Sequence, residues 1–283
     1  MKNLNWGKLI GMILPWSIFC ALVSCSDKLP DPITHPRTQL TLSVDWSQVP
    51  SQELLPDSIL LFVDNDSSFI PAQTNQAFSL HQNSAYTIYG YNRTKYFTIN
   101  KNQATVNIEE DGNNINGNSG PLYYGSVSTD TLNQQAQMAS LKMGQVNRLV
   151  NISISISGAD LTKIEATLSG VASQVAFSTG TVSGNAIALS EGQISSSTNL
   201  IHHVVIPFWL LGISGNSQQL TVTVQDADSS TKSFLYDISS QMNSIFSSNA
   251  KTPVTLEGQL NMKYTGSVTN WTIINGKDYD FQK

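Results

Sequence analysis

The amino-acid sequence predicts an all-β protein made of two β-sandwich domains. Apolar and polar residues alternate along many short segments, turn-forming residues separate these segments, and 283 residues suffice for two domains of ordinary size. Charged residues make up only 12% of the chain, about half of the usual share of roughly 25%. Because 40% of the residues are apolar and the net charge is small, the chain should still fold rather than stay disordered.

Residues 1–24 predict a lipoprotein signal peptide. Lys2 and Lys8 form a short basic start, and residues 9–23, LIGMILPWSIFCALV, carry no charge. This run is shorter than the roughly 20 residues that span a bilayer, but it suits the apolar core of a signal peptide. Leu22-Val23-Ser24-Cys25 resembles a bacterial lipobox, in which the cysteine is acylated, for instance with palmitate, and becomes the new N-terminus. An ordinary secretory signal with an incidental cysteine is the alternative.

Residues 25–37 predict a tether between the lipid and the folded part. Cys20 would leave with the signal peptide, so Cys25 would be the only cysteine of the mature chain and no intramolecular disulfide could form. The segment after Cys25 holds three prolines and no periodic pattern, which indicates an extended linker. We interpret Arg37 as a solvated residue of this tether.

Residues 38–144 predict the N-terminal sandwich. Its opening strand places four apolar residues on one face: Leu40, Leu42, Val44 and Trp46. Further strands are expected at 58–64, 85–92, 104–109 and 122–128, with turns at Asp64-Asn65-Asp66 and Asp111-Gly112. The Gln/Met-rich segment 133–145 is interpreted as lying between the two blocks, with the boundary near Gly144.

Residues 145–283 predict the C-terminal sandwich. Its opening strand alternates Val150, Ile152, Ile154 and Ile156 with polar residues. Further strands are expected at 163–170, 202–210, 219–225, 232–238, 252–262 and 267–274. One short helix is expected within 239–248.

The sequence predicts neither an enzyme nor a metal or cofactor site. A net charge of −5 without a Lys/Arg cluster argues against nucleic-acid binding. There is no Gly-x-Ser-x-Gly elbow and no Gly-rich phosphate loop. His202 and His203 would point to opposite faces of one strand, which is the wrong geometry for joint metal ligation. Three acidic loops, at 64–68, 109–114 and 226–230, are better explained by turn-forming Asp and Asn than by calcium binding.

The order of several segments resembles the FimB-like fimbrial-anchor lipoproteins of Bacteroidetes and related lipoproteins. The matching segments are LSVDWSQVP, YTIYGYN, LYYGSV, RLVNISISISG, IEATLSGVAS, FWLLG before LTVTV, and YDISSQ. They cover most of residues 40–260, whereas 65–84 and 171–200 match nothing in the family pattern. The resemblance implies two transthyretin-like β-sandwiches in tandem, attached to the bacterial outer membrane through lipid on Cys25. It also implies a place at the cell surface or in a fimbria, with fimbrillin-type pilin subunits as partners that join by β-strand exchange.

Within that resemblance, the terminal strands are the expected edges for strand exchange, because they can swap without rethreading the fold. These are residues 38–46 and 267–274, so Trp46 and Trp271 would lie where a partner strand is exchanged. The alternative is that each indole closes its own core.

A second functional hypothesis is a carbohydrate-binding lipoprotein of a glycan-uptake system. The tyrosines of YTIYGYN and LYYG would then stack on sugars. The competing interpretation is that these rings fill the sandwich cores or the seam between the domains, since aromatic residues favour strands and buried positions.

Overall fold

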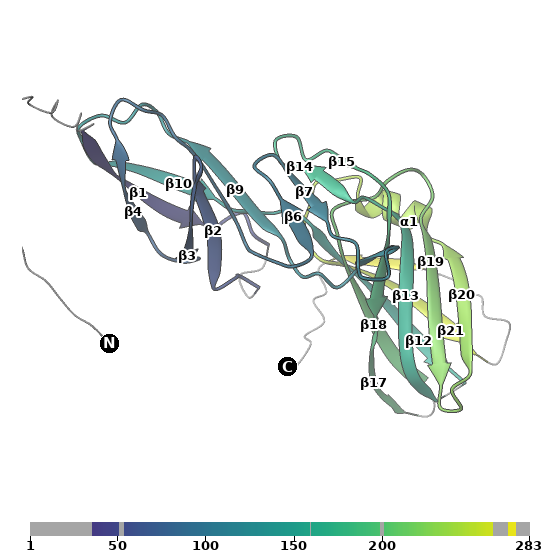
Figure 1. The fold of residues 1–283 in the computed structure, drawn as a ribbon. Helices are drawn as coiled ribbons and strands as arrows, with labels where there is room; N and C mark the ends of the chain where they lie inside the picture. The colour runs from purple at the N-terminus through teal and green to yellow at the C-terminus, as the bar shows by residue number, and fades with distance from the viewer. Residues whose placement is uncertain (1–35, 51–53, 159, 199–200, 263–270, 276–283) are drawn as a thin grey trace, which may run out of the picture. The chain divides into compact units, whose positions relative to one another are not determined.

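The computed structural model describes residues 36–50, 54–158, 160–198, 201–262 and 271–275 (Figure 1). The predicted signal peptide, Cys25 and all of the predicted tether except Pro36 and Arg37 lie outside the described residues. The compact unit that starts at Arg37 is built almost entirely of strands. The predicted all-β class is therefore confirmed.

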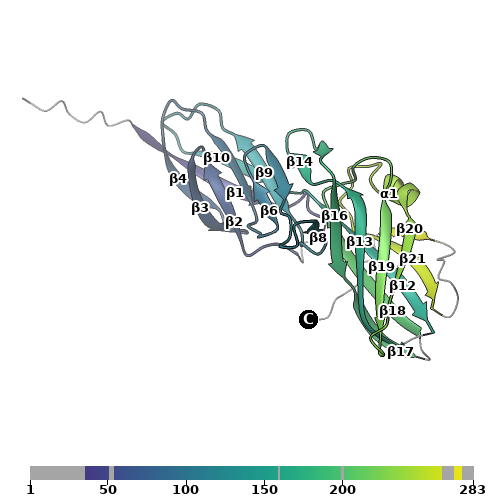
Figure 2. The ribbon, with the colours of Figure 1, turned by 45° about the vertical axis from the view of Figure 1, so that its right-hand side comes forward.

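The described strands form five sheets, each named here by one of its members (Figure 1 and Figure 2). The β1 sheet consists, in order, of β10 (Gln137–Lys142), β1 (Arg37–Asp45) and β4 (Gln76–His81). The β5 sheet consists of β11 (Gly144–Gln145), β9 (Tyr123–Ser128), β5 (Thr87–Tyr91), β2 (Ser58–Val63) and β3 (Asp66–Pro71). The β7 sheet consists of β15 (Val182–Ser183), β14 (Gln174–Ala176), β7 (Gln103–Val106) and β6 (Phe97–Ile99).

The two remaining sheets are the β12 sheet and the β13 sheet. The β12 sheet consists of β17 (Gln193–Thr198), β18 (Ile201–Leu210), β12 (Arg148–Ser157), β21 (Val254–Asn261) and β22 (Thr272–Asn275). The β13 sheet consists of β20 (Thr231–Asp237), β19 (Gln219–Asp226), β13 (Leu161–Val171), β16 (Ala186–Glu191) and β8 (Asn114–Asn116).

The β1 sheet and the β5 sheet bury one shared cluster of side chains, the first core. Leu40 and Leu42 of β1 are completely buried, as the alternating pattern predicts, and so are Ile59 and Leu61 of β2. The predicted turn after β2 is also confirmed. Asp64 has a φ of 52° there, a left-handed conformation that Asp tolerates better than most residues.

A single stretch of chain closes one side of this sandwich. β10 pairs in parallel with β1, and β11, two residues further on, pairs with β9 of the other sheet. Leu141 and Met143 of this stretch are completely buried in the first core. Residues 137–145, part of the segment interpreted as lying between the two blocks, therefore form strands that belong to the first core. Only one side chain of β10 is fully buried, so the strand has no marked apolar pattern.

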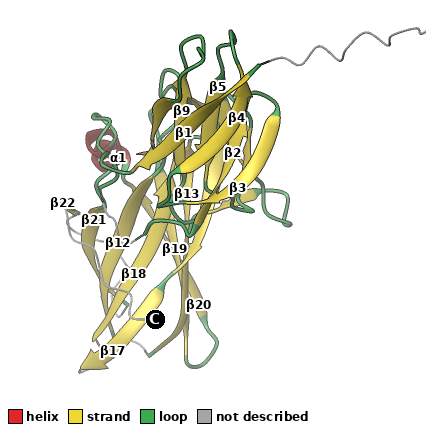
Figure 3. Ribbon diagram, turned by 90° about the vertical axis from the view of Figure 1, so that its left-hand side faces the viewer, coloured by secondary structure: helices red, strands yellow, loops and turns green. Residues whose placement is uncertain are grey.

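A short helix is the only helix in the described ranges, and Figure 3 shows it in red. This helix, α1 (Ser239–Ile245), lies inside the predicted segment 239–248 and buries Met242 and Ile245, which share one helical face. Nowhere in the described ranges is a helix long and apolar enough to cross a membrane.

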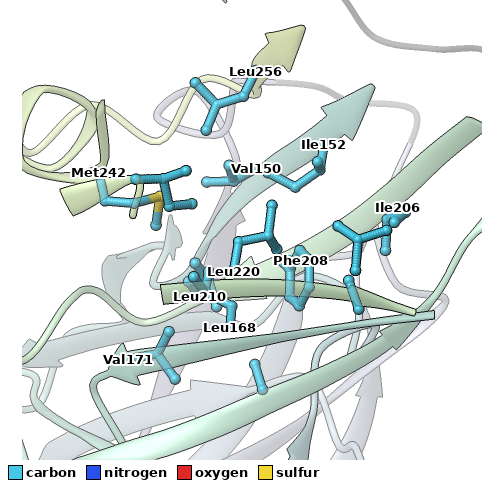
Figure 4. Packing of buried hydrophobic residues seen from close by; sticks show 14 of the residues in the cluster. Val150, Ile152, Leu168, Val171, Ile206, Phe208, Leu210, Leu220, Met242 and Leu256 are labelled. Atoms are coloured by element: carbon cyan, nitrogen blue, oxygen red, sulfur yellow. The ribbon is translucent and has the colours of Figure 1, made fainter. Parts of the chain in front are cut away.

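The β12 sheet, the β13 sheet and α1 bury a second cluster, the second core (Figure 4). Ile152 and Ile154 of β12 are 0% and 1% exposed, whereas the serines between them are only half-buried. The predicted alternation of this strand is confirmed from Ile152 to Ser157, but it is wrong at Asn151, which was expected on the polar face and is 0% exposed. Figure 4 shows Ile152, Ile206, Phe208 and Met242, from three elements, within one packed cluster.

Residues 97–116 contribute to the second core although they lie between two strands of the first. The chain leaves β5, forms β6, β7 and β8, and returns to the first core at β9. Phe97, Ala104, Val106 and Ile115 are buried in the second core. β7 pairs with β14 (Figure 1), and β8, which lies beside β16 in Figure 2, pairs with it in parallel. The division into 38–144 and 145–283 remains a prediction.

Candidate functional site

The first of the two predicted exchange strands does not lie at a sheet edge. β1 is the middle strand of its sheet, with Leu40 opposite Gln137 on one side and opposite Phe78 on the other. The prediction that the opening strand is an edge is therefore wrong for the described structure, because β10 and β4 satisfy both of its sides. Arg37, interpreted as a tether residue, is an exposed residue at the start of β1, opposite His81.

Trp46 follows β1 directly and belongs to the first core. Its side chain is 7% exposed. The indole Nε1 donates a hydrogen bond of 2.7 Å to the carbonyl of Ala72, and the ring lies edge-to-face on Tyr123 with centroids 5.4 Å apart. Burial raises the pKa of Tyr123 to about 12, so this phenol stays neutral at physiological pH. These contacts fit the alternative that Trp46 closes its own core.

The second predicted exchange strand does lie at an edge. β22 pairs with β21 from Thr272 opposite Glu257 to Asn275 opposite Val254, and it has no other strand partner in the described part of the chain (Figure 3). The strand was expected at 267–274, of which residues 267–270 lie outside the described residues. One side of β22 therefore presents backbone donors and acceptors that an added strand can use.

Trp271 precedes β22 and fills space that a glycine leaves in the second core. A Cβ atom placed on Gly258 of β21 would lie 2.9 Å from Cζ3 of the indole, so the ring rests directly on the glycine backbone. The same ring is edge-to-face with Tyr236 of β20, with centroids 5.7 Å apart. Because β20 belongs to the β13 sheet, Trp271 bridges both sheets and helps to close the second core beside the free edge.

We expect Gly258→Ala to destabilise the protein by about 1–3 kcal/mol, because the added methyl group must displace the Trp271 indole. Urea unfolding followed by tryptophan fluorescence measures the loss. Gln259→Ala is the matched control, since the neighbouring Gln259 side chain is exposed. Equal stability of the two variants would show that the indole does not rest on Gly258.

The adjacent histidines occupy opposite faces of β18, as predicted for neighbours in a strand. His202 is buried, with Nε2 3.9 Å from the Asp160 carboxylate. His203 is exposed and its Nδ1 lies 3.0 Å from the Ser155 hydroxyl. Within the described ranges, no group of three or more His, Cys, Asp or Glu side chains could hold a metal ion.

Two of the acidic loops use their carboxylates to hold their own turns. Asp111 accepts hydrogen bonds from the backbone N–H groups of Asn113 and Asn114, each 2.9 Å long, and these bonds lower its pKa. Asp226 accepts in the same way from Asp228 and Ser230. This geometry fits the turn-forming role expected of them.

Four aromatic rings form a row on the outer face of the β5 sheet and beyond it. Ile88 and Gly90 of β5 face the first core, so Tyr89 and Tyr91 point to the other face. Phe62 stacks on Tyr89 with centroids 4.6 Å apart, and Tyr124 stacks on Phe177 at 3.7 Å. The row thus consists of Phe62, Tyr89, Tyr124 and Phe177. Tyr123 lies in the first core and Tyr86 packs against it, whereas Tyr89 and Tyr124 belong to the row, so the tyrosines divide between the two interpretations.

Sequence reasoning missed Arg148, the first residue of β12. Its side chain is 4% exposed although it carries a charge, and it lines a pocket of about 370 Å³ at one end of the second core. The available signal was an arginine that opens an otherwise apolar and serine-rich strand, in a chain with only two other arginines after the predicted signal peptide, Arg37 and Arg93.

These features together define a class of protein. The described residues form an all-β chain with two cores and a free strand at the edge of the β12 sheet. They bring together no cluster of metal-binding side chains, and the two exchange candidates lie in separate cores. Such a chain is suited to binding through surfaces and sheet edges.

No model of a known protein family matches the sequence, and no curated protein is similar to it in sequence. Solved structures do share its fold. The fimbrial anchor protein Mfa2 from Porphyromonas gingivalis aligns with a TM-score of 0.54 and 13% identity, over 86% of this chain and 100% of that one. A candidate adhesin from Bacteroides ovatus aligns with a TM-score of 0.56 and 12% identity, over 84% and 93%.

A candidate polysaccharide-binding protein from Bacteroides thetaiotaomicron aligns with a TM-score of 0.53 and 9% identity, over 85% of this chain and 99% of that one. The chain therefore has the fold of Bacteroidetes adhesins and fimbrial anchor proteins. The resemblance inferred from the order of sequence segments is confirmed at the level of the fold.

Proposed function

We propose that this chain is a lipid-anchored structural subunit of a fimbria, either its anchor or an accessory subunit, held in the bacterial outer membrane through Cys25. Its partners are fimbrillin-type pilin subunits, which it contacts by β-strand exchange. Two transthyretin-like sandwiches in tandem, divided near residue 144, are part of this proposal. The observation that carries it is the free edge of β22 in a fold shared with a fimbrial anchor protein.

The edge of β22 suits strand addition for two reasons. Backbone groups along an unpaired edge supply affinity for any extended strand, and side chains at every second position supply specificity. In addition, Trp271 just before this strand and Ile273 within it pack against the second core. These contacts hold the edge in place. Strand exchange would extend the β12 sheet beyond β22.

The proposal predicts that Thr272→Pro abolishes co-purification with a neighbouring fimbrillin. Thr272 is exposed and lies at the start of β22, and proline removes the backbone donor that strand pairing uses. In-cell cross-linking followed by affinity purification measures the recovery of the pilin subunit.

Thr231→Pro is the matched control, because Thr231 is the exposed first residue of β20, the edge of the other sheet of this core. It should leave pilin recovery intact. Circular dichroism of both variants checks that each remains folded. Full pilin recovery with Thr272→Pro would refute strand exchange at β22.

The carbohydrate-binding alternative has one structural observation in its favour, the aromatic row on the β5 sheet. A sugar stacks on an exposed ring face. Phe62 and Tyr89, however, cover one another at an interplanar angle of 2°, and Tyr124 and Phe177 at 10°. Saturable binding on a glycan array, with no pilin subunit recovered by cross-linking, would favour this alternative.

A further inference from the structure

Arg148 is a buried cation that lies beside an open pocket. The pocket has a volume of about 370 Å³ and lies where α1 ends and β21 begins. It is lined by Arg148, Ser244, Ile245, Ser248, Ala250, Thr252 and Ile273. The Arg148 side chain is 4% exposed, and this burial lowers its pKa.

Among the described residues, the acceptors that bind this guanidinium are neutral carbonyl groups. Its Nε donates a hydrogen bond of 2.8 Å to the carbonyl of Thr252, and Nη1 donates to the carbonyl of Ile245 at the end of α1. A guanidinium has five N–H donors, so Arg148 has further donors beyond the two that form these hydrogen bonds. Within the described ranges, Arg148 forms no ion pair. A buried charge without a countercharge is costly, and an acid that enters the pocket would relieve that cost.

A second cation strengthens the positive potential at this place. The pKa of Lys251 is lowered by burial and by the nearby charge of Arg148. Three of the residues that line the pocket, Ser244, Ser248 and Thr252, carry hydroxyl groups that can donate hydrogen bonds. Lys251 itself does not line the pocket, but the guanidinium of Arg148 and these hydroxyl groups suit a carboxylate, which an arginine can bind with two parallel hydrogen bonds.

The position of the pocket relates it to the free sheet edge. Ile273 of β22 lines the pocket and packs against the second core. In a sheet, the residue directly opposite Ile273 on an added strand projects to the same face. A side chain at that position of a strand paired with β22 would therefore point toward the pocket.

We propose that this pocket receives a carboxylate of the partner strand that pairs with β22, so that Arg148 selects partners with an acidic residue opposite or next to Ile273. This inference rests on the proposed function. A purely structural role, in which Arg148 ties the end of α1 to the β12 sheet, accounts for its two carbonyl bonds. It does not account for the remaining donors or for the neighbouring Lys251.

Ser248→Glu tests the pocket without disturbing the carbonyl bonds of Arg148, because it supplies a tethered carboxylate. In the full mature protein, this variant should raise the melting temperature by about 2–4 °C. Asn249→Glu adds the same charge next to the pocket and should give no gain. The increase should disappear in an Arg148→Met background, as a double-mutant cycle detects. No gain, or an equal gain without Arg148, would overturn the proposal.

Cross-linking in cells tests the partner. Ser248→Glu occupies the pocket and should lower recovery of the pilin subunit at least tenfold, whereas Asn249→Glu should not. If Thr272→Pro abolishes recovery but Ser248→Glu leaves it unchanged, strand exchange stands and the carboxylate proposal falls. If Thr272→Pro has no effect, the proposed function itself falls.

Two further experiments distinguish other sources of the carboxylate. If Asp278→Asn with Asp280→Asn lowers the melting temperature as much as Arg148→Met does, the chain's own acids occupy the pocket and the proposal is overturned. The proposal is also overturned if added glucuronate raises the melting temperature of the wild type while Ser248→Glu leaves pilin recovery unchanged.

Discussion

Replacing Cys25 with alanine is expected to move the protein from the membrane fraction to the soluble periplasm or the medium. The motif Leu22-Val23-Ser24-Cys25 follows a basic and then an apolar segment, which is the order of a lipoprotein signal. Each buried CH₂ group of an acyl chain contributes about 0.8 kcal/mol to membrane binding, and two or more chains anchor a protein stably. Loss of the acylated residue should therefore abolish attachment.

Detergent fractionation and intact-mass analysis of the wild type measure this anchor, and the mass should show acylation on Cys25. Cys20→Ala is the matched control, since this cysteine lies within the predicted signal peptide. That variant should be processed and retained in the membrane fraction like the wild type. A wild-type protein that is unacylated and freely soluble would contradict the anchor.

Lipidation at Cys25 would also limit where the folded unit works. β1 begins at Arg37, 12 residues after the cysteine. An extended chain spans at most about 3.3–3.6 Å per residue, so the folded unit would stay within roughly 40 Å of the lipid surface. A subunit held this close to the membrane suits the base of a filament, which is the position proposed for an anchor.

The strands with strict alternation were predictable from the sequence because each carries its own evidence. β1 and β19 bury every second residue over most of their length, and β12 does so from Ile152 onward, so their positions follow from this pattern. β10 and β16 carry little such evidence. β10 buries Leu141 fully, and β16 buries Ala188 and Ser190, which are small. A strand that contributes small or few apolar side chains looks like a polar loop in the sequence.

Pairing between distant segments was the main feature that the sequence did not predict. β1 is a central strand only because β10 follows it about 90 residues later and pairs in parallel. The local pattern of β1 is the same whether or not that partner exists. For the same reason, the local sequence of residues 97–116 does not predict that they contribute to the second core, because this contribution depends on pairing with β14 and β16.

The sequence predicted the edge strand of the candidate site, but it did not predict the side-chain contacts around that strand. Trp271 and the edge strand after it were singled out from the sequence. The contact of the indole with Gly258 depends on the register between β21 and β22, which no local pattern encodes. Arg148 was not singled out from the sequence. Its burial between α1 and β21 arises from elements about 100 residues further along the chain.

Truncation of Ile152 to alanine should be the most destabilising of the single substitutions considered for the second core. Its side chain is fully buried in the middle of β12, where it packs with residues of both sheets. Loss of a buried Ile side chain to Ala costs about 2–5 kcal/mol, because it combines lost apolar burial with the cavity left behind. Chemical denaturation of the soluble Cys25→Ala protein measures the change in the unfolding midpoint.

The neighbouring Ser153 provides the control for the Ile152 prediction, because it points to the opposite face of the same strand and is only half-buried. Ser153→Ala should change stability by less than about 0.5 kcal/mol. If the two cores belong to separate domains, Ile152→Ala should shift the transition of the second domain and leave that of the first in place. Equal losses at Ile152 and Ser153 would show that both faces of β12 are packed alike. The alternation on which the fold prediction rests would then have the wrong physical basis at this strand.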